Sequence, residues 1–140
     1  MKEIKNIIDK YIYDINGEKQ IQMFYEIGKY IITNKLNVKD VQLYLRSIYG
    51  LSIVFTDRNL NNMIKFSTYD INLLDKFKKI TWKNILVIMK HDNSLIDICL
   101  ECKPTKYELL DYINHNKKLQ KNDIIEMDDM LEELKMIRKK

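Results

Sequence analysis

Several residue types are rare or missing in this chain of 140 residues, which has no alanine, 3 glycines, 1 proline, 2 cysteines and 2 histidines. Three scattered glycines do not make a phosphate-binding glycine-rich loop, and two cysteines are too few for a disulfide-rich secreted scaffold. No apolar run approaches the ~20 residues that a membrane span needs. The N-terminus, MKEIKNIIDK, lacks the uninterrupted apolar stretch of a signal peptide. We therefore expect a cytoplasmic protein that makes no membrane contact and keeps its cysteines reduced.

Residues suited to catalysis are also scarce. His91 and His115 lie outside any metal-binding or nucleophile motif, and the acidic residues are scattered without a spacing that marks a catalytic pair. Metal-dependent nuclease chemistry would need clustered carboxylates and a lysine on strands, and strand-like segments are almost absent. The sequence therefore predicts a protein that is not an enzyme and that has no cofactor and no metal site.

One short motif has the spacing of a metal or redox site. Cys99 and Cys102 form a C-x-x-C, and His115 follows at a distance suited to a third zinc ligand. The fourth ligand is missing, because positions 119 and 120 are leucine and glutamine. Two helical, half-buried cysteines are the favoured interpretation over metal or redox use, so we expect no tightly held zinc.

Apolar residues recur three and four positions apart along nearly the whole chain, which predicts amphipathic helices. The expected helices cover about 4–15, 18–34, 38–48, 56–67, 70–79, 81–90, 93–102, 105–113 and 123–137. Asn37, Thr56 and Thr81 are expected N-caps, and Thr105 with Glu108 has the spacing of a capping box. Gly28 interrupts a helix and is expected to mark a close helix crossing. The run LSIVF, 51–55, is the one β-like segment and suits either a strand or an extended connector.

Charge divides the chain unevenly. The net charge is +4, but residues 123–134 hold six acids and no base, whereas residues 1–122 hold 20 basic and 14 acidic residues. The polar joint 114–123 is the expected boundary, which gives a helical domain of 1–114 and a tail of 115–140. The tail has an apolar seam at Ile124, Met127, Met130, Leu131, Leu134 and Ile137. This seam could dock on the body or join two copies, and the homodimer is slightly favoured.

The segment FTDRNLNNMIKF, 55–66, carries the most suggestive polar stripe. Arg58, Asn61, Asn62 and Lys65 fall at i, i+3, i+4 and i+7, so they share one helix face. Arginine can bridge guanine, asparagine can bridge adenine, and lysine can contact phosphate. With the helix at 38–48 this resembles a helix-turn-helix, although the connection is longer than such turns use. The alternative is a solvated helix face in a chain rich in lysine and asparagine.

Four segments resemble the N-terminal domain of the YhcG-like, or DUF1016, proteins. They are FYEIGKYI (24–31), FTDRNLNNMIKF (55–66), ITWKNI (80–85) and YELLDYI (107–113). The family shows an aromatic-x-x-Ile-Gly helix, GFSxRNLxxMxxFY, LSWSHY and W-S-x-R-E-L-x-x-Q-I. The core of the resemblance is Arg58, Asn59, Leu60, Met63 and Phe66, within a similarity that spans about 20–114.

The resemblance implies a helical DNA-binding or interaction module that, in the family, precedes a PD-(D/E)XK nuclease domain and is associated with defence and mobile elements. This chain departs from the pattern. Too few residues follow position 114 for a nuclease domain, and Asn84 replaces the family's histidine. The tryptophan and arginine of the last family motif are also replaced, around Pro104 and Tyr107. Nuclease activity is therefore not implied, and Arg58 could equally hold the preceding loop in place.

The sequence thus predicts an all-α, compact multi-helix domain with a helix-turn-helix-like core and a C-terminal amphipathic helix. The leading function is non-catalytic DNA binding, possible also for RNA, in a phage, mobile-element or defence setting. The expected nucleic-acid-binding residues are Arg58, Asn59, Asn61, Asn62, Lys65, Lys76, Lys78, Lys79 and Lys83, and the expected dimer residues are Met127, Met130, Leu131, Leu134 and Ile137. The alternatives are a protein-binding regulator or inhibitor of a nuclease complex, and a recognition subunit for a separately encoded nuclease.

Overall fold

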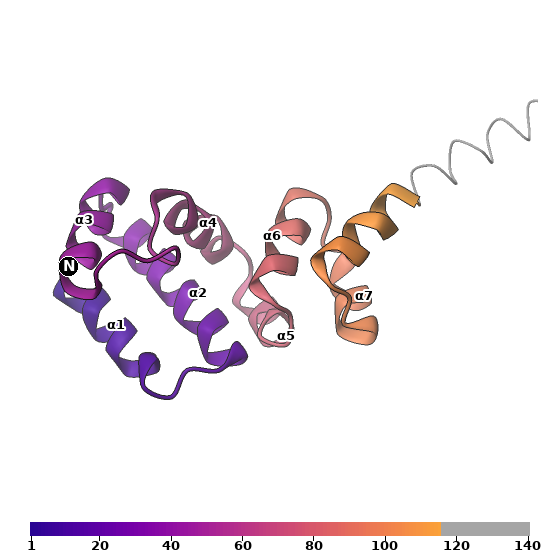
Figure 1. Cartoon of the computed structure of the whole chain (residues 1–140), viewed down its shortest axis with the longest axis horizontal. Coiled ribbons are helices and arrows are strands. Elements are labelled where there is room, and N and C mark those ends of the chain that lie inside the picture. The colour runs from indigo at the N-terminus through magenta and orange to yellow at the C-terminus, as the bar shows by residue number, and fades with distance from the viewer. Residues whose placement is uncertain (116–140) are drawn as a thin grey trace, which may run out of the picture. The chain divides into compact units, whose positions relative to one another are not determined.

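The computed structural model describes residues 1–115 and confirms the all-α expectation, because no strand occurs in that range (Figure 1). The chain divides into two compact units, Met1–Lys103 and a unit that starts at Pro104. The boundary expected near 114 borders residues outside the described range and stays a prediction, as does the apolar seam with its dimer residues. No helix among the described residues combines the length and apolarity that crossing a bilayer requires.

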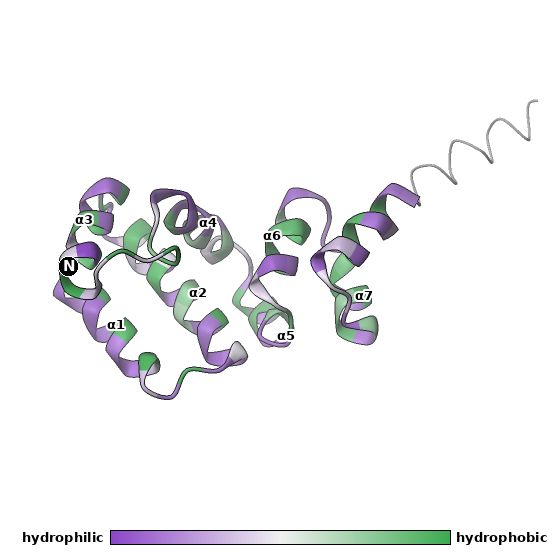
Figure 2. Ribbon diagram, viewed as in Figure 1, coloured by the Kyte–Doolittle hydropathy of each residue, from purple (hydrophilic) through white to green (hydrophobic). Residues whose placement is uncertain are grey.

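Four helices build the core of the first unit: α1 (Lys2–Ile12), α2 (Gly17–Thr33), α3 (Val38–Tyr49) and α4 (Asp57–Ser67). Figure 1 shows α2 between α1 and α4, and α2 packs against both. In Figure 2 these ribbons alternate between green apolar and purple polar stretches, as amphipathic helices do. The shared core consists of Ile4, Ile8, Met23, Phe24, Ile27, Ile31, Val41, Leu45, Phe55, Leu60 and Met63.

Gly28 sets the distance between α2 and α4, as the sequence predicted. A Cβ atom at this position would lie 2.1 Å from the backbone oxygen of Met63 and 2.9 Å from the backbone nitrogen of Ile64. Only a residue without a side chain allows the two backbones to approach this closely. The inner side of α4 is therefore fixed against α2 by backbone contact.

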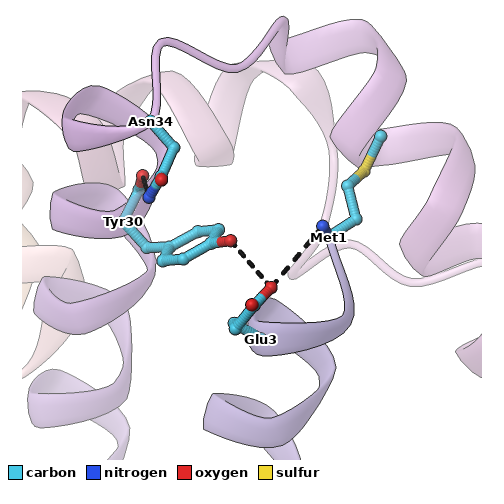
Figure 3. Close-up of polar contacts among 4 residues, drawn as sticks. All are labelled: Met1, Glu3, Tyr30 and Asn34. Atoms are coloured by element: carbon cyan, nitrogen blue, oxygen red, sulfur yellow. Dashed lines mark hydrogen bonds and ion pairs between the residues drawn. The ribbon is translucent and has the colours of Figure 1, made fainter.

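Polar contacts attach α1 to α2. Figure 3 shows Tyr30 Oη donating to Glu3 Oε2 at 2.9 Å, with the N-terminal amine 3.8 Å from the same carboxylate oxygen. Nearby, Asn34 Nδ2 donates to the carbonyl of Tyr30 at 2.9 Å. The hydrogen bond from Tyr30 lowers the pKa of Glu3. These contacts link the start of α1 to the C-terminal half of α2.

The predicted helix caps are confirmed. Asn37 Oδ1 accepts from the backbone nitrogens of Lys39 and Asp40 at 2.9 and 3.2 Å, and Thr56 Oγ1 accepts from that of Asn59 at 3.2 Å. Thr81 caps α6 in the same way. Side chains of this kind satisfy amide groups that the first helical turn leaves without partners.

The β-like run 51–55 is a connector and forms no strand. Leu51 and Ile53 are 80% and 89% exposed, whereas Phe55 is buried. Residues 50–56 link α3 to α4, which is longer than the turn of a standard helix-turn-helix. The helix-turn-helix-like core therefore stays a prediction, while both of its helices are present.

The first unit continues with a 3-10 turn, η1 (Ile71–Leu73), then α5 (Leu74–Phe77), α6 (Trp82–Lys90) and α7 (Leu95–Cys102). Helix α7 ends at Cys102, and Lys103, the residue that follows it, has a left-handed backbone conformation with φ of 45°. In the second unit residues 106–115 are helical, and the predicted capping box is confirmed. Thr105 N donates to Glu108 Oε1 at 3.3 Å, and Glu108 N donates to Thr105 Oγ1 at 3.2 Å.

Candidate nucleic-acid interface

The polar stripe lies on the outer side of α4. Arg58, Asn61 and Lys65 are exposed, and Asn62 is half-buried, while Leu60 on the opposite side is fully buried. Within residues 1–115 the side chains of these four polar residues make no hydrogen bond or ion pair. Their donors and acceptors are therefore available to a ligand, and the rigid crossing at Gly28 fixes the helix that carries them.

Asn59, which the sequence grouped with the nucleic-acid-binding residues, has its side chain engaged inside the protein. Its Nδ2 donates to the carbonyl oxygen of Val54 at 2.7 Å, and its Oδ1 accepts from Trp82 Nε1 at 2.9 Å. Both polar ends of the side chain are thus used inside the protein. The physical reason is its helical position, about 100° from Arg58, which turns it toward α6 instead of solvent.

Trp82 connects α4 to the start of α6. Its ring makes edge-to-face contacts with Phe24 and Phe66, at centroid distances of 4.8 and 5.4 Å. Phe66 also contacts Phe77 of α5 at 5.3 Å. Aromatic pairs of this geometry add to the stabilisation from apolar burial. The basic stripe of α4 and the lysines near α6 are therefore held by one aromatic cluster.

The expected lysines lie on α5, after it and at the start of α6. Lys76, Lys79 and Lys83 are exposed, and Lys78 is half-buried with its Nζ 3.6 Å from Asp75 Oδ1. Among residues 1–115, the other three lysines, like Arg58 and Lys65, lie within ion-pair distance of no carboxylate. Elsewhere among residues 1–115, the lysines at 5, 10 and 19 each pair with an acidic side chain, and other basic residues such as Lys39 and Lys90 do not. Positive charge on the α4–α6 side is thus left largely uncompensated.

The structure brings three of these lysines into a groove of about 890 Å³, and separates them from the α4 stripe. Lys76, Lys78 and Lys79 line the groove together with Lys103, which follows α7. Neither Lys83 nor the α4 residues are among its described lining. Sequence reasoning missed Lys103 because no local pattern connects it with residues 76–79; only the packing of α7 brings it there. Trp82 was predicted to pack, but not to line this groove.

The cysteines show no metal-binding arrangement within the described residues, where no three histidine, cysteine or acidic side chains are grouped for an ion. Cys99 is buried and Cys102 is exposed. Burial raises the pKa of the Cys99 thiol, which disfavours the reactive thiolate. Asn84, which the sequence resemblance aligns with a histidine of the DUF1016 motif, is only 3% exposed and so lies in the core.

Comparison with known proteins gives no match: no family model fits the chain, and neither a curated protein nor a solved structure is significantly similar to it. The resemblance to the DUF1016 N-terminal domain therefore rests on the four short motifs alone.

Proposed function

We propose that this protein is a non-catalytic DNA-binding module that inserts the outer face of α4 into the major groove. The observation that carries the proposal is a set of four polar side chains without an internal bond among the described residues, on a helix with a rigidly packed inner side. Arg58, Asn61 and Lys65 of this set are exposed, and Asn62 is half-buried. At a rise of about 1.5 Å per residue the stripe spans about 10 Å. The helix itself, about 10–12 Å across with its side chains, fits a major groove about 12 Å wide.

The chemistry of the stripe divides into two roles. Arg58 and the two asparagines have the planar donor and acceptor groups that pair with guanine and adenine edges. Lys65, at the other end of the stripe, supplies a point charge for phosphate. The segment 55–83 has six basic and three acidic residues, so it attracts DNA before any specific contact forms.

The test compares variants by fluorescence anisotropy with a labelled mixed-sequence duplex. The double substitution Arg58→Ala and Lys65→Ala should weaken binding at least about tenfold, because it removes a base or phosphate contact at each end of the stripe. The matched control is Lys39→Ala with Lys90→Ala, two exposed lysines elsewhere in the first unit. Equal weakening in both pairs would show nonspecific charge attraction instead of a site on α4.

A protein-binding regulator of a nuclease complex is the second candidate, and one observation favours it. Leu51 and Ile53 are 80% and 89% exposed on a connector that is held in place. Val54 N donates to Ser52 Oγ at 3.1 Å, and Asn59 fixes the carbonyl of Val54. Fixed, exposed apolar side chains suit a protein partner. Under this alternative Leu51→Ser with Ile53→Ser would abolish partner binding, whereas DNA affinity in the leading proposal would hardly change.

A further inference from the structure

The groove that contains Lys76, Lys78, Lys79 and Lys103 differs from the α4 stripe in its construction. Its lining includes the apolar residues Ile21, Ile80, Trp82 and Leu100, of which the two isoleucines are buried. The four lysines that also line it come from two separate places in the sequence. A groove lined by both apolar and basic residues favours a ligand that has flat apolar faces and a charged backbone.

The net charge of the residues that line the groove favours an anionic ligand. Two carboxylates, Glu18 and Asp75, also line the groove, and Asp75 is 3.6 Å from Lys78. Four ammonium groups against two carboxylates leave an excess of two positive charges at the groove. Because Lys76, Lys79 and Lys103 are exposed and make no ion pair within residues 1–115, their ammonium groups can reach a phosphate without first breaking an internal bond.

Trp82 supplies the surface that would distinguish a nucleic acid from another polyanion. Its Nε1 donates to Asn59 Oδ1 at 2.9 Å, which restrains the ring, and this half-buried residue is among those that line the groove. Unpaired bases stack on aromatic side chains, and this contact tolerates any base sequence. A duplex keeps its bases stacked on each other and would present only its backbone to the groove.

We propose that this groove binds a single-stranded stretch of nucleic acid, with the phosphodiester backbone on Lys76, Lys79 and Lys103 and a base against Trp82. This inference rests on the proposed DNA-binding function, which supplies the ligand class, nucleic acid. It adds a second binding surface to the one on α4. The two surfaces would allow the module to hold duplex on α4 and an adjoining single strand in the groove.

Trp82 is the one tryptophan of the chain, so tryptophan fluorescence reports on a ligand that binds in the groove. Titration of the full-length protein with a twelve-residue oligothymidylate at low salt should quench the fluorescence of Trp82. Affinity should exceed that for thymidine monophosphate, because several phosphates are held at once. No quenching and no binding at low salt would overturn the proposal, and so would equal affinity for the monophosphate, which would indicate a small-molecule site.

Variants separate the groove from α4. Lys76→Ala with Lys79→Ala should lower the slope of log affinity against log salt by about 1.4, since each single-strand phosphate contact contributes about 0.7. The control pair Lys39→Ala with Lys90→Ala and the α4 pair Arg58→Ala with Lys65→Ala should both retain the quenching. Loss of quenching in the α4 pair but not in the groove pair would place the single strand on α4 and contradict the proposal.

A polyglutamate peptide of similar charge tests the alternative of an acidic protein partner. It should bind much more weakly than the oligonucleotide, because it offers no base to stack on Trp82; equal binding would overturn the proposal in favour of a protein ligand. Duplex anisotropy with the same variants keeps the two proposals apart. If the natural protein binds no duplex but shows oligothymidylate quenching, only the α4 function is removed. If it binds duplex but shows no quenching, only the groove is removed.

Discussion

Asn59 and Asn61 lie two positions apart on α4 and have opposite environments. Asn59 bonds Val54 and Trp82, whereas Asn61 is exposed and makes no hydrogen bond among the described residues. The sequence identified the caps at Asn37, Thr56 and Thr81 because a cap acts on residues two or three positions away. It could not identify the role of Asn59, since Trp82 lies 23 positions further along the chain.

The different environments of the two asparagines predict that the same substitution to alanine affects stability differently at each position. Asn59→Ala should lower the free energy of unfolding by about 1–3 kcal/mol, because a carbonyl and an indole N–H lose their partner. Asn61→Ala should change it by less than about 0.5 kcal/mol, as is usual at exposed positions. Urea denaturation followed by circular dichroism measures both. A loss of stability in Asn61→Ala equal to that in Asn59→Ala would contradict the assignment.

Gly28 and Gly17 give a second matched pair, this time within one helix. A Cβ at Gly28 would meet the backbone of Met63 at 2.1 Å, whereas a Cβ at Gly17 would have no heavy atom within 4 Å. Gly28→Ala should destabilise the protein by about 2 kcal/mol, since overpacking costs about 1–3 kcal/mol and alanine's helix preference returns up to about 1. Gly17→Ala should be neutral or slightly stabilising. Equal thermal melts for the two variants would disprove the close crossing.

At the scale of elements, the spacing of apolar residues was sufficient to locate helices, but it could not decide whether residues 51–55 form a strand. Apolar spacing of three and four placed α2 within one residue of its observed limits, Gly17–Thr33. The run 51–55 has strand-forming residues, but a strand needs a neighbour, and none occurs within the described range. The side chain of Asn59 donates to the carbonyl of Val54, five positions earlier, and so holds the end of this segment as a connector.

The attachment of α1 to α3 predicts a pH dependence. Asp9 accepts from Lys5 Nζ at 2.6 Å and from Tyr49 Oη at 2.8 Å, and these bonds lower the pKa of Asp9. The folded carboxylate thus takes up a proton less readily than the unfolded one, whose pKa is about 3.9. The resulting stabilisation is present above that pH and is lost as the pH falls toward the folded value.

The measurement is the stability difference between the natural protein and Asp9→Asn, from urea denaturation at pH 6 and at pH 3. The difference should be larger at pH 6 and should shrink at pH 3, where the unfolded carboxylate takes up a proton more readily than the folded one and part of the stabilisation is lost. Asp97→Asn, at an exposed acid without an ion pair in the described range, is the control and should show little change with pH. A difference for Asp9→Asn that stays constant would contradict the role of this contact.

At the scale of the whole molecule, the sequence predicted the class of fold and the composition of the α4 face, but not how the surfaces are arranged. The α4 stripe follows from helical spacing alone. The residues that line the groove lie within 16–21 and 75–82 and at 100 and 103. No local sequence pattern connects these positions before the helices pack. Such a site is visible only in three dimensions, which is why Lys103 was not anticipated.

The central claim is that α4 contacts DNA directly, and the salt dependence of duplex binding tests it most directly. Each phosphate contact to duplex DNA contributes about 0.9 to the slope of log affinity against log salt. The natural protein should bind a mixed-sequence duplex with a steep slope, and Lys65→Ala should reduce this slope by about 0.9, whereas Lys39→Ala should leave it unchanged. Absence of duplex binding at low salt, or a slope that Lys65→Ala does not alter, would contradict the account.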